Sequence, residues 1–435
     1  MSKDLLRKAL IYRWVIFWTM AVAYVVVYFH RLSPAVVALD LQETFGATGG
    51  FMGLMASAYF YPYAIMQLPA GLLSDSLGPR KTVTWFLILA AAGSALFGLA
   101  PNMEFAVVAR AIVGLGVSMV FIPTMKLLSH WFRGHEFAIM VSIVNVMGGV
   151  GALTAAGPLA MMTGWVGWRA SFELIGAVTL LMAIMVWLFV RNKPEDMGWP
   201  SIVQMDRPGQ TTSGAAQPIR LWEGAKTVVT DRYFWPVAIW FFFTLGVFFS
   251  FGGLWAGPYL MNVYGLTKSQ AGSILNMIAV GLIVGSPLLS VLSDRVFKSR
   301  KKVLALSSVV LVCLMAFLNF YPKGLPHYGL YFIMLLLSVT SSAIVVIAFT
   351  TTKEMFPIQI AGTSVGTVNL FPFLGGAVFQ PFIGWILDMF PRNVSGGYSL
   401  EAFKAALLVL MIASIIGLIA TFFMKETFPK DFGAR

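Results

Sequence analysis

The segment GLLSDSLGPRK (Gly71–Lys81) has a counterpart in LLSVLSDRVFKSRKK (Leu288–Lys302), and both contain Leu-Ser-Asp followed by basic residues. A second correspondence holds without gaps at an offset of 224 residues, the difference between positions 356 and 132. The pairs are Phe132 and Phe356, Val141 and Val365, Val144 and Val368, Asn145 and Asn369, and Gly151 and Gly375. Repetition at a fixed offset indicates that a structural unit is duplicated.

The composition around these segments is typical of a membrane protein. The 435 residues are 58% hydrophobic and 11% charged, which excludes a disordered chain and does not suit a water-soluble surface. The pattern predicts twelve apolar spans, near residues 14–37, 49–73, 82–100, 105–128, 136–163, 168–190, 234–262, 269–292, 302–321, 329–351, 359–388 and 401–424.

The predicted fold class is therefore an all-α integral membrane protein, with twelve transmembrane helices in two six-helix bundles related by a pseudo-twofold axis. We expect an N-terminal bundle over 1–191, a cytoplasmic linker over 192–233, and a C-terminal bundle with a short cytoplasmic tail over 234–435. The linker prediction rests on the polar, Pro- and Gly-rich stretch QMDRPGQTTSGAAQP.

The net charge of +12 follows the spans, so we do not attribute it to nucleic-acid binding. With the N-terminus inside, few cations fall in the outer loops: Arg169, Lys268, Lys323, Arg392 and Lys404. Cytoplasmic loops carry the excess of Lys and Arg in membrane proteins. We expect both termini to be cytoplasmic and the protein to lie in the plasma membrane, or the inner membrane of a bacterium.

The loop after the second span resembles a known signature. Gly71-x-x-x-Asp75-x-x-Gly78-x-Arg80 is similar to the signature loop of the major facilitator superfamily, although Ser76 and Pro79 stand where members usually carry basic residues. Glycines permit a tight turn and close approach, and the Asp accepts hydrogen bonds, so the loop can latch one bundle conformation. We expect the latch to comprise Gly71, Asp75, Gly78 and Arg80, with its partial repeat at Asp294 and Arg295.

Within the superfamily, Tyr28-Phe29-His30-Arg31-Leu32-Ser33 resembles the first-span motif of the organic-anion and sugar-phosphate branch. The resemblance implies that Arg31 holds the anionic group of the substrate. Tyr24, Tyr28 and Arg31 share one helix face, and an arginine inside an apolar helix usually faces a cavity or a partner. The alternative is that Arg31 snorkels to the lipid headgroups.

Other candidates have competing structural interpretations. Lys126 can contact the anion or anchor the membrane interface. Arg110 is a candidate for proton coupling, but a structural hydrogen-bonding role is favoured. For His30, whose ordinary pKa lies near physiological pH, a neutral, hydrogen-bonded ring is favoured over coupling. Glu173 is a third coupling candidate, and solvent access at this carboxylate would separate an anion transporter from a drug exporter.

Polar and aromatic groups inside spans complete the expected substrate site. An unsatisfied polar group is costly in lipid, so it tends to face a partner or water. These candidates are Asn145, Asn276, Asn369 and Gln380, together with Trp255 and Tyr259 near a Gly- and Pro-rich break in the seventh span. The alternatives are helix-to-helix hydrogen bonds for the amides and an interfacial aromatic belt for the two rings.

No catalytic motif is present, and a single cysteine, Cys313, excludes a cysteine cluster, so we predict no enzyme activity, metal or cofactor. The predicted function is secondary active transport of a small organic anion by alternating access, as proton-coupled symport or exchange, by a monomer. The alternatives are transport of amino acids or small peptides, proton-driven drug export, and a non-transporting membrane receptor.

Overall fold

The computed structural model describes residues 3–201, 221–357, 360–393 and 396–428, which are almost entirely helical. Ten helical stretches in these residues are long and apolar enough to cross a membrane, judged by length and composition. One of them, Ile139–Phe189, has 51 residues and contains two of the predicted spans. Its chain direction changes at Gly167, whose φ of 78° is accessible to glycine at no steric cost.

The predicted span 49–73 is the second reason why ten stretches, and not twelve, are long enough to cross a membrane. It is divided into α3 (Gly49–Ser57), α4 (Phe60–Met66) and α5 (Pro69–Ser76), each too short to count alone. Pro62 lies near the beginning of α4 and Pro69 begins α5, and proline cannot continue the hydrogen bonding of a preceding helical turn. With these two differences resolved, the described residues contain the twelve predicted spans, except for position 359 at the start of the eleventh, which lies outside the described part.

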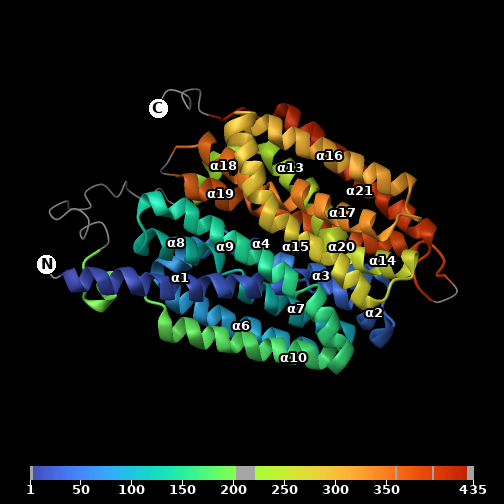
Figure 1. Cartoon of the computed structure of the whole chain (residues 1–435), viewed down its shortest axis with the longest axis horizontal. Coiled ribbons are helices and arrows are strands. Elements are labelled where there is room, and N and C mark those ends of the chain that lie inside the picture. Colours follow the sequence, from blue (N-terminus) through green and yellow to red (C-terminus); the bar gives the residue numbers. More distant parts are fainter. Residues whose placement is uncertain (1–2, 202–220, 358–359, 394–395, 429–435) are drawn as a thin grey trace.

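The two halves of the chain form two bundles that lie side by side (Figure 1). The first contains α1 (Lys3–Leu32), α2 (Pro34–Phe45), α3 to α5, α6 (Pro79–Gly98), α7 (Met103–Val117), α8 (Phe121–Trp131), α9 (Gly134–Thr154) and α10 (Gly157–Phe189). The second contains α13 (Phe234–Val247), η2 (Phe248–Trp255), α14 (Ala256–Tyr264), α15 (Lys268–Val291), η3 (Leu292–Val296), α16 (Arg300–Phe320), α17 (His327–Leu337), η4 (Ser338–Ala343), α18 (Val345–Met355), α19 (Ala361–Val368), α20 (Leu370–Asp388) and α21 (Leu400–Phe423).

The internal duplication extends to helix boundaries. The helix α8 begins at Phe121 and ends at Trp131, and α18 begins at Val345 and ends at Met355, so both boundaries repeat at the offset of 224 residues. Each helix follows an interruption in its span, before Phe121 in one half and at η4 in the other. The fourth and tenth spans therefore share an interruption of the α-helix as well as a sequence pattern.

Helix ends are fixed locally by capping side chains. The hydroxyl of Thr267 accepts a hydrogen bond from the backbone N–H of Gln270, whose side chain returns a contact to the backbone of Thr267. Such reciprocal caps satisfy N–H groups that lack a partner in the first turn. Side-chain caps also begin α3, α7, α16 and α21, at Thr48, Asn102, Ser299 and Ser399.

The beginning of α1 and the end of α21 lie at one end of the molecule, which we call the proximal end, and α2 and α14 lie at the opposite, distal end (Figure 1). The expected linker 192–233 is partly helical, since it includes η1 (Pro194–Met197) and α12 (Leu221–Thr230). The helix α12 packs against α19. Residues 202–220 lie outside the described part.

Candidate functional site

A cavity of about 240 Å³ lies between the two bundles. The first bundle contributes Tyr24, Tyr28, Arg31, Tyr63, Phe121, Val141 and Asn145 to its lining. The second contributes Leu245, Phe249, Leu282, Ser286, Ser342, Val345, Val346, Phe349, Thr350, Lys353, Val365, Asn369, Pro372 and Phe373. The lining reaches Lys353 in the last turn of α18, near the proximal end (Figure 1).

Arg31 is a buried cation in the cavity wall, and aromatic rings surround it. Its guanidinium carbon lies 4.5 Å from the ring centre of Tyr28 and 5.0 Å from those of Tyr63 and Phe373. The side chain is 4% exposed, and its Nε and Nη2 atoms have no hydrogen-bond partner among the described residues. Aromatic faces stabilise a cation but do not satisfy its N–H donors. Arg31 therefore offers donors to a ligand that accepts hydrogen bonds.

The other aromatic residues predicted on this face also line the cavity. The rings of Tyr24 and Tyr28 lie 5.4 Å apart in an edge-to-face arrangement, and Tyr24 lies 5.4 Å from the ring of Phe121. These ring contacts hold in place the part of the cavity wall that includes Arg31. The three residues predicted to share one helix face, Tyr24, Tyr28 and Arg31, therefore all line the same cavity.

The repeat-related asparagines both line the cavity, from opposite bundles. Asn145 donates a 3.1 Å hydrogen bond to the carbonyl oxygen of Val141 in its own helix. Asn369 donates a 2.8 Å hydrogen bond to the side-chain oxygen of Gln67, which joins the two bundles. Asn369 therefore contributes to bundle contact as well as to the cavity wall.

The remaining polar candidates of the expected substrate site do not line the cavity. The side-chain oxygen of Asn276 accepts a 3.0 Å hydrogen bond from the N–H of Gly157, and Gln380 donates a 2.9 Å hydrogen bond to the carbonyl oxygen of Phe249. Tyr259 donates to the carbonyl oxygen of Pro322 at 2.5 Å. All three side chains are therefore engaged with backbone groups, although the side-chain oxygen of Gln380 has no hydrogen-bond partner among the described residues.

Trp255 is likewise outside the lining, at the end of the wide helical turns of η2. Its indole N–H donates a 3.0 Å hydrogen bond to the carbonyl oxygen of Gln380. The predicted break in this span is a π-helix, which keeps backbone hydrogen bonds while it displaces the following residues around the axis.

His30 and Arg110 meet behind the cavity wall. Arg110 donates a 2.9 Å hydrogen bond to the backbone oxygen of His30, and the His30 ring lies 3.3 Å from the hydroxyl of Thr179. Both side chains are buried and neither lines the cavity. Glu173, the third coupling candidate, is exposed on α10, so it is not the buried carboxylate that a drug exporter commonly has.

The signature loop is a compact turn at the proximal end. Gly78 has a φ of 81°, and the side-chain oxygen of Asn192 accepts a 2.8 Å hydrogen bond from the N–H of Arg80. The Arg80 guanidinium also lies 4.4 Å from the ring centre of Trp187. A Cβ at Gly71 would meet no atom within 4 Å, so the close approach we expected there is absent from its described surroundings. The side chain of Asp75 lies outside the described part.

Lys126 interacts with the same loop and does not line the cavity. Its ammonium donates a 3.0 Å hydrogen bond to the backbone oxygen of Ser74, on the helix that carries the signature. This contact links α8 to α5, so Lys126 stabilises the loop from a neighbouring span.

The repeated loop in the second bundle is organised by a residue that we did not single out. Arg300 forms an ion pair with Asp294 and another with Glu354 at 3.4 Å, and its Nη1 donates a 3.0 Å hydrogen bond to Ser293. The predicted partner Arg295 is exposed. Arg300 therefore connects the proximal ends of three helical segments, and its place after the loop in a basic run concealed this role.

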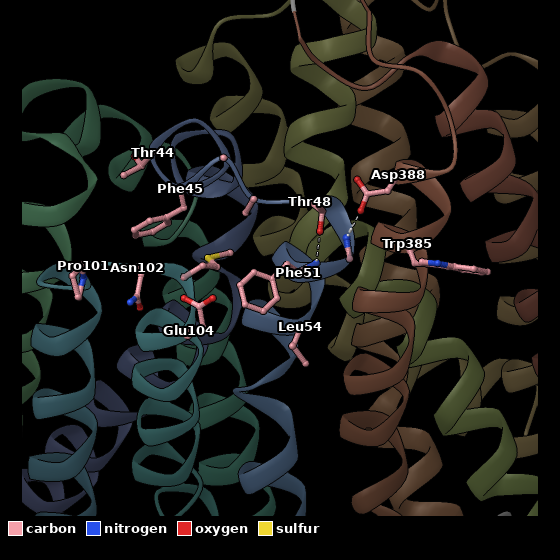
Figure 2. Close-up of a pocket in the computed structure, with 14 residues that line it drawn as sticks. Thr44, Phe45, Thr48, Phe51, Leu54, Pro101, Asn102, Glu104, Trp385 and Asp388 are labelled. Atoms are coloured by element: carbon pink, nitrogen blue, oxygen red, sulfur yellow. Dashed lines mark hydrogen bonds between the residues drawn. The ribbon is translucent and has the colours of Figure 1, made fainter.

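The distal ends of the bundles are closed against each other. The carboxylate of Asp388 accepts 2.7 Å hydrogen bonds from the backbone N–H groups of Gly49 and Gly50 (Figure 2). Lys268 forms a 2.5 Å ion pair with Asp40, also between bundles. These charge-assisted contacts hold α3 to α20 and α2 to α15.

Glycine permits this closure. A Cβ added to Gly384 would lie 2.0 Å from the backbone oxygen of Gly49, and one added to Gly257 would lie 1.9 Å from that of Ala35. A side chain at either position would force the bundles apart. The distal seam, which we define as the contacts of Asp388, Lys268, Gly384 and Gly257 with the first bundle, separates the cavity from the distal surface.

The sequence matches known transporters over most of its length. Residues 16–379 match the Major Facilitator Superfamily. The chain belongs to this superfamily. A probable sulfoacetate transporter of Cupriavidus necator is 25% identical over 66% of each chain. A glycerol-3-phosphate transporter of Bacillus subtilis is 25% identical over 90% of this chain and 89% of its own.

A solved structure shows the same fold. The crystal structure of a bacterial homologue of the human lysosomal transporter Spinster, in an inward-facing and unoccupied conformation, gives a TM-score of 0.74 at 16% identity, over 98% of each chain. The match of residues 16–379 confirms the superfamily resemblance expected from the signature loop, and the solved structure confirms the two-bundle fold. This chain is a multi-pass membrane transporter of the superfamily.

Proposed function

We propose that this facilitator-superfamily transporter moves a small organic anion, such as a carboxylate, a sugar acid or a phosphate ester, by alternating access. The observation that carries the proposal is Arg31, which lines a cavity between two bundles and has two buried donor atoms without a hydrogen-bond partner among the described residues. A buried guanidinium without a carboxylate is costly unless a ligand neutralises it. Its planar donor arrangement suits carboxylate and phosphate oxygens.

The relatives support the same class of substrate. Sulfoacetate and glycerol 3-phosphate, which appear in the names of the two similar proteins, are both small organic anions. Arg31, which we singled out from its resemblance to that branch, lies on the cavity wall in this chain.

The bundle contacts support alternating access. The distal seam is closed, while the cavity lining extends towards the proximal end at Lys353. Transport requires the opposite arrangement to form in turn, with the distal seam broken and the proximal ends brought together. We propose that both termini are cytoplasmic, so that the proximal end faces the cytoplasm of a plasma-membrane protein that works as a monomer.

For energy coupling we propose proton symport or exchange of one anion for another. The pair of Arg110 and His30, the residue before Arg31 in the chain, is the structural candidate for linking protonation to substrate binding. Its buried position gives the neutral, structural role the greater support. Reconstituted vesicles decide between the two modes, since exchange is stimulated by anion on the opposite side and symport by an inward proton gradient.

The test of the proposed function is a ligand screen followed by transport. The purified protein is heated with organic anions, amino acids, dipeptides or lipophilic cations, because a ligand that prefers the folded state raises its melting temperature. We expect anions to stabilise the wild type and Arg31→Ala to lose that stabilisation. Stabilisation by cations alone would contradict the proposal, and radiolabelled uptake into vesicles then identifies the transported anion.

A further inference from the structure

A second cation lines the cavity from the opposite bundle. Lys353 lies in the last turn of α18, and its side chain is exposed to the cavity that Arg31 lines from α1. Lysines at helix ends are often anchored at the membrane interface, but a residue in the lining of a central cavity meets the path of the ligand.

Lys353 has no acidic partner among the described residues. The neighbouring carboxylate, Glu354, is engaged elsewhere, since it accepts from Arg300 at 3.4 Å and from the hydroxyl of Thr427 at 2.7 Å. Asp294 is occupied by the same arginine. No carboxylate occurs in the described cavity lining, so the charges of Arg31 and Lys353 are both available to a ligand.

The two cations belong to parts of the protein that move relative to each other in alternating access. Arg31 belongs to α1 of the first bundle, and the rings around it come from both bundles, whereas Lys353 ends a helix of the second bundle. A ligand with one negative charge can neutralise one of them. A ligand with two negative charges can neutralise both and so favours a state in which the bundles approach each other.

We propose that the substrate is an organic dianion and that Lys353 is the residue that distinguishes it from a monoanion. This inference rests on the proposed function, with Arg31 binding one anionic oxygen group and Lys353 the remaining charge. It adds a specificity-determining residue to the anion site. The shared chemistry is a second negative charge, which a dicarboxylate, a phosphate monoester or a sulfonate-bearing carboxylate supplies.

The experiment compares matched anions that differ in charge. Affinities of the full-length protein are measured for D-glucarate against D-gluconate and for glycerol 3-phosphate against D-glycerate, by thermal shift and calorimetry. We expect the dianion of at least one pair to bind about tenfold more tightly, the effect of one additional charged contact. Lys353→Gln should bring that ratio close to one, and Lys353→Arg should keep it.

The control is Lys226→Gln, which removes an exposed positive charge from α12, outside the cavity lining. It should leave the ratio unchanged. An unchanged ratio in Lys353→Gln, or equal binding of both members of each pair by the wild type, overturns the role of Lys353 while Arg31→Ala still tests the anion site. Absence of binding by every anion overturns the proposed function together with this inference.

Discussion

The carboxylate of Asp388, at the end of α20, accepts a 2.7 Å hydrogen bond from the backbone N–H of Gly49, at the beginning of α3. Its second oxygen accepts from Gly50 at the same distance. The two residues lie 339 positions apart in the sequence and belong to different bundles. A helix N-terminus carries a partial positive charge, so an aspartate from the opposite bundle makes a strong closing contact there.

Replacing this carboxylate should open the distal side. Asp388→Asn keeps the size of the side chain but removes its charge and one acceptor, so we expect the population to shift towards the distal-open state. The shift is measured by alkylation of a cysteine at position 51, next to the seam in Figure 2, in a Cys313→Ser background. We expect labelling several times faster than in the parent, because loss of a charged hydrogen bond of ~1.5 kcal/mol changes a population about tenfold.

The matched control is Glu43→Gln, which removes an exposed carboxylate of α2 that is not one of the residues defining the seam. Equal labelling rates for Asp388→Asn and its parent would show that the glycines and the Lys268 ion pair keep the distal side closed alone.

Anion binding should depend on the shape of the Arg31 side chain as well as on its charge. Arg31→Lys retains a cation but loses the planar pair of donors, so we expect about tenfold weaker binding of the anion found in the screen, or more. Calorimetry measures the change. Wild-type affinity in this variant would mean that Arg31 acts only through its charge or outside the substrate site.

Stability should depend on pH through Glu136, which lies in the first turn of α9, before the apolar stretch that begins at Ile139. This carboxylate accepts hydrogen bonds from Arg13 at 2.8 and 3.1 Å. Burial acts to raise the pKa of Glu136, but the N–H of Arg133 and the Arg13 guanidinium outweigh it and hold that pKa below its ordinary value of 4.5. The resulting stability is present above pH 4.5 and is lost as the pH falls through the lower, folded-state pKa.

We therefore expect Glu136→Gln to lower the melting temperature at pH 7, because the substitution lowers the free energy of unfolding by about 1 kcal/mol. The difference from wild type should shrink once the pH falls below 4.5. Scanning fluorimetry at several pH values checks this, with the exposed Glu195→Gln as the control. A gap that persists unchanged at low pH would show that the ion pair is not its source.

His30→Gln should leave the pH dependence of transport unaltered. The ring is buried against Thr179, at 3.3 Å, behind the cavity wall, and a glutamine can make the same kind of hydrogen bond without titrating. Uptake into vesicles from pH 5.5 to 8 gives the profile. A flattened profile with intact uptake would assign the coupling proton to His30 after all.

Hydropathy and the internal repeat predicted the twelve spans and the two bundles because both depend on composition over about 20 residues. They did not predict the division of the second span into α3, α4 and α5, which depends on local proline geometry. Nor did they predict the π-helical turns of η2, since such turns are set by packing between helices.

The candidate site was predicted where a charge in an apolar span gave a strong signal. Arg31 is such a case, and the structure places it on the cavity wall. Asn276 and Gln380 have the same signal but satisfy backbone groups instead, because the rotation of each helix decides which face meets the cavity. Lys353 was missed because a basic residue at a span end ordinarily indicates an interface anchor.

The glycine contacts at the distal seam have a consequence for genetics. Any single-nucleotide missense change in a glycine codon adds at least a Cβ, and at Gly384 or Gly257 that atom would collide with the backbone of the other bundle. A random mutant library selected for lost uptake but normal membrane expression should therefore be enriched at these codons. Such alleles would encode folded carriers that fail to complete their cycle.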